Sequence, residues 1–210
     1  MITPTASHLR RWLMSLIALG GLCAAGAAVA GEQSDKEAIE ALIHCYAAGT
    51  DAIGDHLTNA DPLAAGTAIY RRCFTPDAQI RAWFPHQPFD SQVFPHPEAH
   101  ADTAPKTVIG PDEWAKFADS VFRGKGYTVT QHMISNVATT IHGRTGTLTA
   151  YLNATHVISG DVIGGPSRCV AVANGTYSLN VQKINGAWKI TALNLTLITF
   201  NPVFQTGKGC

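Results

Sequence analysis

Charge is scarce in this 210-residue chain. Charged residues make up 14% of the sequence, and 15 Lys and Arg balance 15 Asp and Glu. The chain therefore lacks the basic stripe of a nucleic-acid-binding surface and the acidic low-complexity tracts of a disordered protein. A balanced, mildly apolar composition suits a protein with an internal apolar pocket. We expect a small hydrophobic molecule as its partner, and no nucleic acid.

The N-terminal apolar run is too short for a comfortable membrane span. It covers residues 12–22, follows two arginines at residues 10–11, and precedes small residues that end at Ala30. This order is typical of a secretory signal peptide with an A-x-A cleavage site, and the arginine pair gives it weak twin-arginine character. We expect residues 1–30 to be removed and the mature protein to be periplasmic or secreted, free of the membrane. An uncleaved anchor is the alternative.

The cysteines have no zinc-site spacing. Four of the five lie beyond the predicted signal peptide, at Cys45, Cys73, Cys169 and Cys210. An even number in an exported protein predicts two disulfides, in one of three connectivities. Because Cys45 and Cys73 lie in consecutive predicted helices, we favour the pairs Cys45–Cys73 and Cys169–Cys210. Four buried thiols are the alternative.

Helix signals fill the first half of the mature chain, and strand signals fill the second. Helices are predicted to start at a capping box over residues 34–37, at residues 61–62, where proline follows an N-cap aspartate, and at residues 110–112. The second helix is expected to end near residues 75–76. Strands are predicted at residues 78–84, 127–141, 146–158, 169–184 and 187–200, with an Asn-Gly hairpin before the last.

The chain has no internal repeats and no second domain. Residues 31–210 are predicted to form one α+β domain, in which three helices pack on a strongly curved, mainly antiparallel sheet that closes into a cone-shaped barrel around a pocket. Residues 85–106 are rich in Pro and His and have no periodicity. A loop of this length in a compact domain is often a lid.

Two histidines lie inside predicted strands on faces without charge. Because residues two apart share a face of a strand, His132 shares its face with Thr130, Ile134 and Asn136. His156 lies on a face of alanine, leucine and isoleucine. A histidine on such a face is either a core residue with satisfied ring nitrogens or a group for proton chemistry.

Five short motifs follow one another along the chain. They begin with Y-A-A-G-T-D at Tyr46 and C-F-T-P-D-A at Cys73, and continue with G-x-D-E-W-x-x-F at Gly110, T-Q-H-x-I-x-N at Thr130 and N-G-A-W-K-I at Asn185. Together they resemble the SnoaL-like proteins of the nuclear-transport-factor-two-like superfamily, over roughly residues 35–198. The closest resemblance in motif is to scytalone dehydratase.

The resemblance implies catalytic roles for His132, His156 and Asp51. The aspartate would fix the tautomer of a histidine and stabilise its charged form, and Tyr46 would donate a hydrogen bond to a substrate oxygen. The alternatives are purely structural roles, in which both histidines and the tyrosine are core residues and the aspartate caps a helix. The chain departs from the family pattern at Thr50, where the family has a tyrosine. Substrate-binding roles are predicted for Asn136, Tyr177, Trp83, Trp114, Phe117 and Ile134.

The function that this site implies is an exported, cofactor-independent lyase acting by general acid–base catalysis on a small cyclic or aromatic molecule. The reaction would be dehydration or retro-aldol cleavage. Alternatives are an isomerase of the ketosteroid-isomerase type, a non-catalytic binding protein of the same fold, and a metal enzyme using the His-rich loop. We expect no metal and no cofactor, and a possible homo-oligomer, either a dimer or a trimer.

Overall fold

The computed structural model describes residues 7–84, 105–158 and 169–204, and the side chains of residues 31–84, 105–158 and 170–199. The chain divides into two compact units, Met1–Glu37 and Ala38–Cys210. The helix α1, Ser7–Gly54, begins in the first unit and ends in the second. No helix in the described part of the chain is long and apolar enough to cross a membrane.

The predicted start of the first helix at residues 34–37 is wrong, because α1 is already helical from Ser7. The alanine- and leucine-rich segment before residue 31 has high helix propensity, so the capping-box pattern stands inside a helix with no free end to cap. Cleavage at residue 30 stays a prediction. The predicted lid lies outside the described residues except for its last two positions.

The second unit is an α+β domain, as predicted. Its helices are the last turns of α1, α2 (Pro62–Cys73) and α3 (Pro111–Lys125). Its strands are β1 (Phe74–Trp83), β2 (Lys106–Ile109), β3 (Tyr127–His142), β4 (Thr145–Ile158), β5 (Cys169–Ile184) and β6 (Ala187–Phe204).

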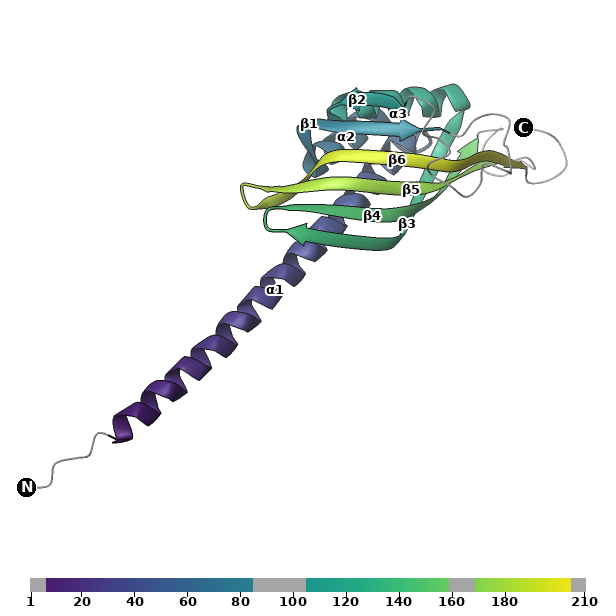
Figure 1. The fold of residues 1–210 in the computed structure, drawn as a ribbon. Helices are drawn as coiled ribbons and strands as arrows, with labels where there is room; N and C mark the ends of the chain where they lie inside the picture. Colours follow the sequence, from purple (N-terminus) through teal and green to yellow (C-terminus); the bar gives the residue numbers. More distant parts are fainter. Residues whose placement is uncertain (1–6, 85–104, 159–168, 205–210) are drawn as a thin grey trace, which may run out of the picture. The chain divides into compact units, whose positions relative to one another are not determined.

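The strands form one mixed six-stranded sheet in the order β2-β1-β6-β5-β4-β3, which Figure 1 shows with α2 and α3 beside β1 and β2. Every pairing is antiparallel except β1 with β6. The sheet is open, with edges at β2 and β3, and the predicted class, three helices packed on a mainly antiparallel sheet, is confirmed. The short strand β2 was not predicted, because four residues carry too little alternation to detect.

Bulges bend the long strands. The register shifts between Ser135 and Ala138 in β3, and at two places where β5 pairs with β6. A bulge adds an unpaired residue, which bends a strand and increases its twist. At the other end of the domain, Asn185 and Gly186 both have positive φ, as the tight Asn-Gly turn requires.

The core lies between the helices and one face of the sheet. In β4 every second residue from Gly146 to His156 is buried, while most residues between them are exposed. The second helix ends at Cys73 rather than at residues 75–76, and β1 includes Pro76. Proline is tolerated there because the ladder between β1 and β6 is interrupted between Phe74 and Gln79.

Candidate active site

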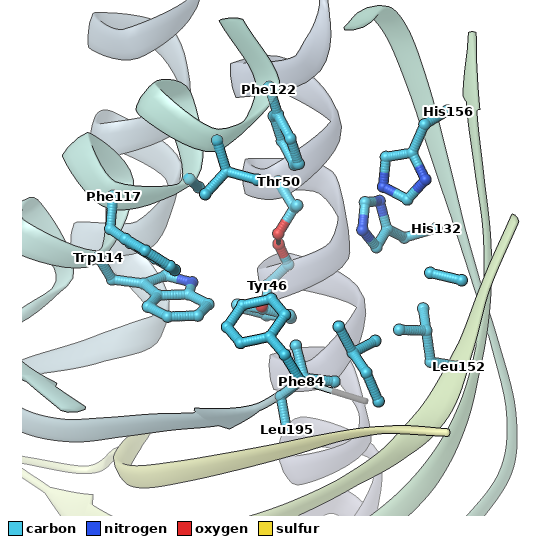
Figure 2. Close-up of a pocket in the computed structure, with 14 residues that line it drawn as sticks. Tyr46, Thr50, Phe84, Trp114, Phe117, Phe122, His132, Leu152, His156 and Leu195 are labelled. Carbon is cyan, nitrogen blue, oxygen red and sulfur yellow. Dashed lines mark hydrogen bonds between the residues drawn. The ribbon is translucent and has the colours of Figure 1, made fainter. Parts of the chain in front are cut away.

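A pocket opens between α1, α3 and the concave face of the sheet. It encloses about 530 Å³ of empty volume, part of which is open to solvent. Figure 2 shows the two histidine rings on one side and Trp114 and Phe117 of α3 on the other. The described lining residues are Tyr46, Thr50, Phe84, Trp114, Phe117, Ala118, Val121, Phe122, His132, Leu152, His156, Ala173, Leu195 and Leu197.

Asp51 and His132 form a carboxylate–imidazole pair. Nδ1 of His132 lies 2.7 Å from Oδ1 of Asp51, and the His132 side chain is only 7% exposed. The same carboxylate accepts hydrogen bonds from the hydroxyl of Thr130 at 3.0 Å and from the backbone N–H of His132 at 3.1 Å. Because a carboxylate can only accept, Nδ1 carries the proton and Nε2 keeps its lone pair. This tautomer makes Nε2 a proton acceptor.

Gly54 brings the end of α1 close enough to β3 for this contact. A Cβ at this position would overlap the side chain of Thr130. Thr130 in turn donates to Asp51, one helical turn before Gly54. The glycine therefore fixes the spacing that lets a helix residue reach a histidine 81 positions later in the chain.

His156 is a neutral ring beside the pair. Its centroid lies 5.4 Å from that of His132, with the planes nearly perpendicular, and it is 2% exposed. Burial lowers its pKa to about 4, and the His132 ring adds to the shift, while the carbonyl of Ala171 and the charge of Asp51 oppose it. Nδ1 lies 3.3 Å from the Ala171 carbonyl oxygen, so it donates there. His156 is therefore uncharged near neutral pH.

A cluster of hydroxyl groups lies at the floor of the pocket. The hydroxyl of Thr50 donates to the backbone carbonyl of Tyr46 at 3.0 Å and lies 2.6 Å from the hydroxyl of Tyr70. Since a hydroxyl has one proton, Tyr70 is the donor to Thr50. The Tyr46 ring stacks on Tyr70 at 5.5 Å and meets Tyr177 edge-on at 5.4 Å. We call Tyr46, Thr50, Tyr70, Trp114 and Tyr177 the hydroxyl cluster.

Burial keeps the tyrosines of this cluster neutral. It raises the pKa of Tyr46 to about 12, although nearby polar groups of Trp114, Thr50 and Tyr177 act in the opposite direction. The pKa values of Tyr70 and Tyr177 also lie well above the usual value, chiefly because both rings are buried. These hydroxyls are therefore hydrogen-bond donors, not bases, at physiological pH.

The structure brings together all four predicted catalytic residues. His132, His156 and Tyr46 line the pocket, and Asp51 lies behind His132. Of the predicted substrate-binding residues, only Trp114 and Phe117 are among the described lining residues.

Four predicted substrate-binding residues lie elsewhere. Asn136 has φ 52° in the bulge of β3 and is exposed, because the bulge interrupts the alternation that predicted its face. Tyr177 lies in the hydroxyl cluster behind Tyr46, and Ile134 packs at the margin of the core. Trp83 is half-buried, and its neighbour Phe84 lines the pocket instead.

Sequence reasoning did not identify Tyr70 or the leucines of β6 as part of this region. Leu195 and Leu197 are two apart on the buried face of their strand, and this alternation is a signal that could have indicated them. Nothing local distinguishes Tyr70 from an ordinary core tyrosine.

A disulfide joins Cys45 in α1 to Cys73 at the end of α2, with a Cα–Cα distance of 6.1 Å. The predicted Cys169–Cys210 pair lies outside the described side chains. Within the described ranges, no group of three or more His, Cys, Asp or Glu residues could hold a metal ion.

Comparisons with known proteins point to one fold. A family model described as the SnoaL-like domain matches residues 32–194. A comparison with curated protein sequences found no match. Among solved structures, a protein from Kribbella flavida is 22% identical, with a TM-score of 0.53, covering 81% of this chain and 95% of its own.

Two further solved structures carry functional names. A candidate scytalone dehydratase from Novosphingobium aromaticivorans is 16% identical, with a TM-score of 0.52, covering 81% of this chain and 88% of its own. A hexachlorocyclohexane dehydrochlorinase from Novosphingobium barchaimii is 13% identical, with a TM-score of 0.54, covering 82% and 92%. At these identities the likeness concerns the fold.

Proposed function

The chain belongs to the SnoaL-like domain family, and from this premise we propose that it is a cofactor-independent lyase that removes water from a small cyclic molecule by general acid–base catalysis. His132 is the base, Asp51 orients it, and Tyr46 donates a hydrogen bond to the substrate. His156 is a neutral pocket wall beside His132.

The observation that carries this proposal is the Asp51–His132 pair. The 2.7 Å contact holds the proton on Nδ1 and leaves Nε2 as the basic atom on a ring that lines the pocket. When Nε2 takes a proton, the adjacent carboxylate stabilises the imidazolium. The neutral state of His156 also matters, because a second positive ring 5.4 Å away would oppose that charge.

The proposed elimination conserves atoms and charge. Nε2 of His132 removes a proton from the carbon beside an activating group, and the C–H electron pair moves into that group. The electrons then return to form a C=C bond and expel hydroxide from the next carbon. The imidazolium gives the same proton to the hydroxide, so water leaves and His132 is neutral again. General acid–base catalysis of this kind contributes roughly 10²–10⁴-fold in rate.

The surroundings favour a flat apolar substrate. Trp114 and Phe117 lie 5.3 Å apart between ring centroids, and Phe122 stands 5.7 Å from the His156 ring. Two of the structural neighbours are named for eliminations, a dehydration and a dehydrochlorination. These names support the reaction class as a proposal for this chain.

A test uses 3-hydroxy-1-tetralone, which loses water to form 1-naphthol. The wild-type protein is expected to accelerate the appearance of 1-naphthol absorbance above the buffer rate. His132→Gln removes the base, and Asp51→Asn no longer holds His132 in the required tautomer. Each variant is expected to lower kcat by roughly 10²–10⁴-fold. The exposed His44→Gln is the matched control. Equal rates for wild type and His132→Gln would reject the proposal.

We also propose export, with residues 1–30 as a cleaved signal peptide. The Cys45–Cys73 disulfide supports this, because disulfides persist in oxidising compartments. The test is the N-terminal sequence of the protein purified from its native host, with Gly31 as the expected first residue.

A further inference from the structure

We propose that a cavity at the start of α3 is a second binding site, and that it takes a small organic carboxylate. The carboxylate group binds at the first turn of α3 and at Lys189, and the apolar part of the ligand packs against the cavity walls. None of the described residues that line this cavity also lines the candidate active site. The inference therefore does not rest on the proposed lyase function.

The cavity lies where the start of α3 meets the end of α2 and the starts of β1 and β6. It encloses about 1040 Å³ of empty volume, part of which is open to solvent. Phe74, Pro76, Ile109 and Ile184 give it apolar walls. The remaining lining residues are mostly polar or charged, so the cavity suits a molecule with an apolar part and a polar end.

The first observation is that α3 begins without a side-chain cap. Its N-cap residue is Gly110, and no side chain accepts a hydrogen bond from the first turn. Gly110 has φ 87°, and a Cβ at this position would lie 2.7 Å from the carbonyl oxygen of Pro76. No residue with a side chain fits there without strain, so the usual capping residues are excluded.

Two N–H groups of this first turn are left over. A helix leaves its first four N–H groups without an intrahelical acceptor. The N–H of Gly110 donates to the carbonyl of Ala78 at 2.8 Å, and Pro111 has no N–H. Those of Asp112 and Glu113 remain, and such groups at a helix start favour an anion.

The second, independent observation is the hydroxyl of Thr75. The ladder between β1 and β6 is interrupted between Phe74 and Gln79, so Thr75 lies outside it. Thr75 is 7% exposed, and its hydroxyl is buried with no hydrogen-bond partner among the described residues. A buried polar group of this kind calls for an explanation. Thr75 lines the cavity, and an oxygen bound there would accept its proton.

The charges around the cavity leave one cation over. Arg71 holds the carboxylate of Asp112 with contacts of 2.9 and 2.6 Å, and Lys116 holds that of Glu113 at 2.7 Å. Lys189 donates to a backbone carbonyl at the end of α2, and no carboxylate in the described ranges lies within ion-pair distance of it. An ammonium has three donors. One surplus positive charge matches a monoanion, and the apolar walls favour an organic one.

The test follows benzoate binding by ¹H–¹⁵N NMR, which reports where the probe binds, with benzamide as its uncharged analogue. Benzoate is expected to shift the amide signals of Asp112 and Glu113 and to bind at least about tenfold more tightly than benzamide, because hydrogen bonds to a charged group are stronger. Lys189→Met keeps the apolar stem and removes the charge. It is expected to weaken benzoate about tenfold and to leave benzamide unchanged.

A second variant serves if Lys189→Met does not fold. Ile109→Glu places a negative charge on the cavity wall at a position that is 55% exposed, and it is expected to weaken benzoate but not benzamide. Leu57→Glu is the matched control. Leu57 is 50% exposed and lies outside the cavity, so this variant is expected to bind benzoate as the wild type does.

The inference is overturned if benzoate shifts no signals, or shifts only those of the active-site pocket. Equal affinities for benzoate and benzamide, or unchanged benzoate affinity in both Lys189→Met and Ile109→Glu, would also overturn it. His132→Gln is expected to bind benzoate at this site as the wild type does. If 3-hydroxy-1-tetralone is not dehydrated but benzoate binds here, the lyase assignment falls and the second site stands.

Discussion

Replacing His156 with Gln is expected to flatten the dependence of stability on pH between about 6.5 and 4. The folded protein holds this ring at a pKa of about 4, below the ordinary value of 6.5 that it regains on unfolding. As the pH falls through this window, the unfolded chain takes up a proton that the folded protein does not, and stability is lost. Above pH 6.5 His156 is neutral in both the folded and the unfolded protein, so it no longer contributes to the pH dependence of stability.

The difference of about 2.5 pKa units corresponds to about 3 kcal/mol, at 1.36 kcal/mol per unit, once the pH is below 4. At pH 5 about 2 kcal/mol of it is already lost. Urea unfolding at pH 7 and pH 5 gives the two free energies for wild type and for His156→Gln. Carboxylates titrate in both proteins, so the difference between the two pH slopes isolates the histidine.

His44→Gln, which removes an exposed histidine, is the control and is expected to keep the wild-type slope. The reasoning is refuted if His156→Gln loses as much stability as the wild type between pH 7 and pH 5. It is also refuted if the wild-type protein becomes more stable relative to the variant as the pH falls, because that would mean the folded state binds the proton.

Two further predictions concern α1. Gly54→Ala is expected to lower the free energy of unfolding by roughly 1–3 kcal/mol, because the added methyl group overpacks against Thr130. By displacing Asp51 it is also expected to lower kcat by up to about 10²-fold. Gly124→Ala, whose added methyl group meets open space, is the control in the same unfolding and rate assays. Replacing Cys45 and Cys73 together with Ala is expected to lower the free energy of unfolding by about 3–4 kcal/mol, from the loop entropy of a 28-residue separation. An unfolding free energy equal to that of the oxidised wild type would contradict the second.

The regular part of the sheet is what the sequence predicts best. The alternation in β4 is unbroken, so it places His156 on the buried face. In β3 the same rule holds from Thr130 to Ser135 and then fails at Asn136, where a residue with positive φ enters the bulge. Bulges depend on the neighbouring strand, so a period counted along one strand does not detect them.

The candidate site is less predictable than the sheet. The contact between Asp51 and His132 joins residues 81 positions apart, and only the family motifs brought them together. The hydroxyl cluster draws on α1, α2, α3 and β5, and its hydrogen bonds depend on how these elements pack. Tyr70 therefore reads as a core aromatic in the sequence and Trp114 as an apolar lining residue, and the polar atoms of both gain meaning only in three dimensions.

The most direct test of the central claim is proton exchange at carbon. Incubation of 1-tetralone with the protein in D₂O, followed by ¹H NMR, reports removal of the proton beside the carbonyl without need of a leaving group. The account predicts deuterium at that carbon with wild-type protein and exchange at the buffer rate with His132→Gln. Equal exchange by wild type and His132→Gln would contradict the assignment of His132 as the base.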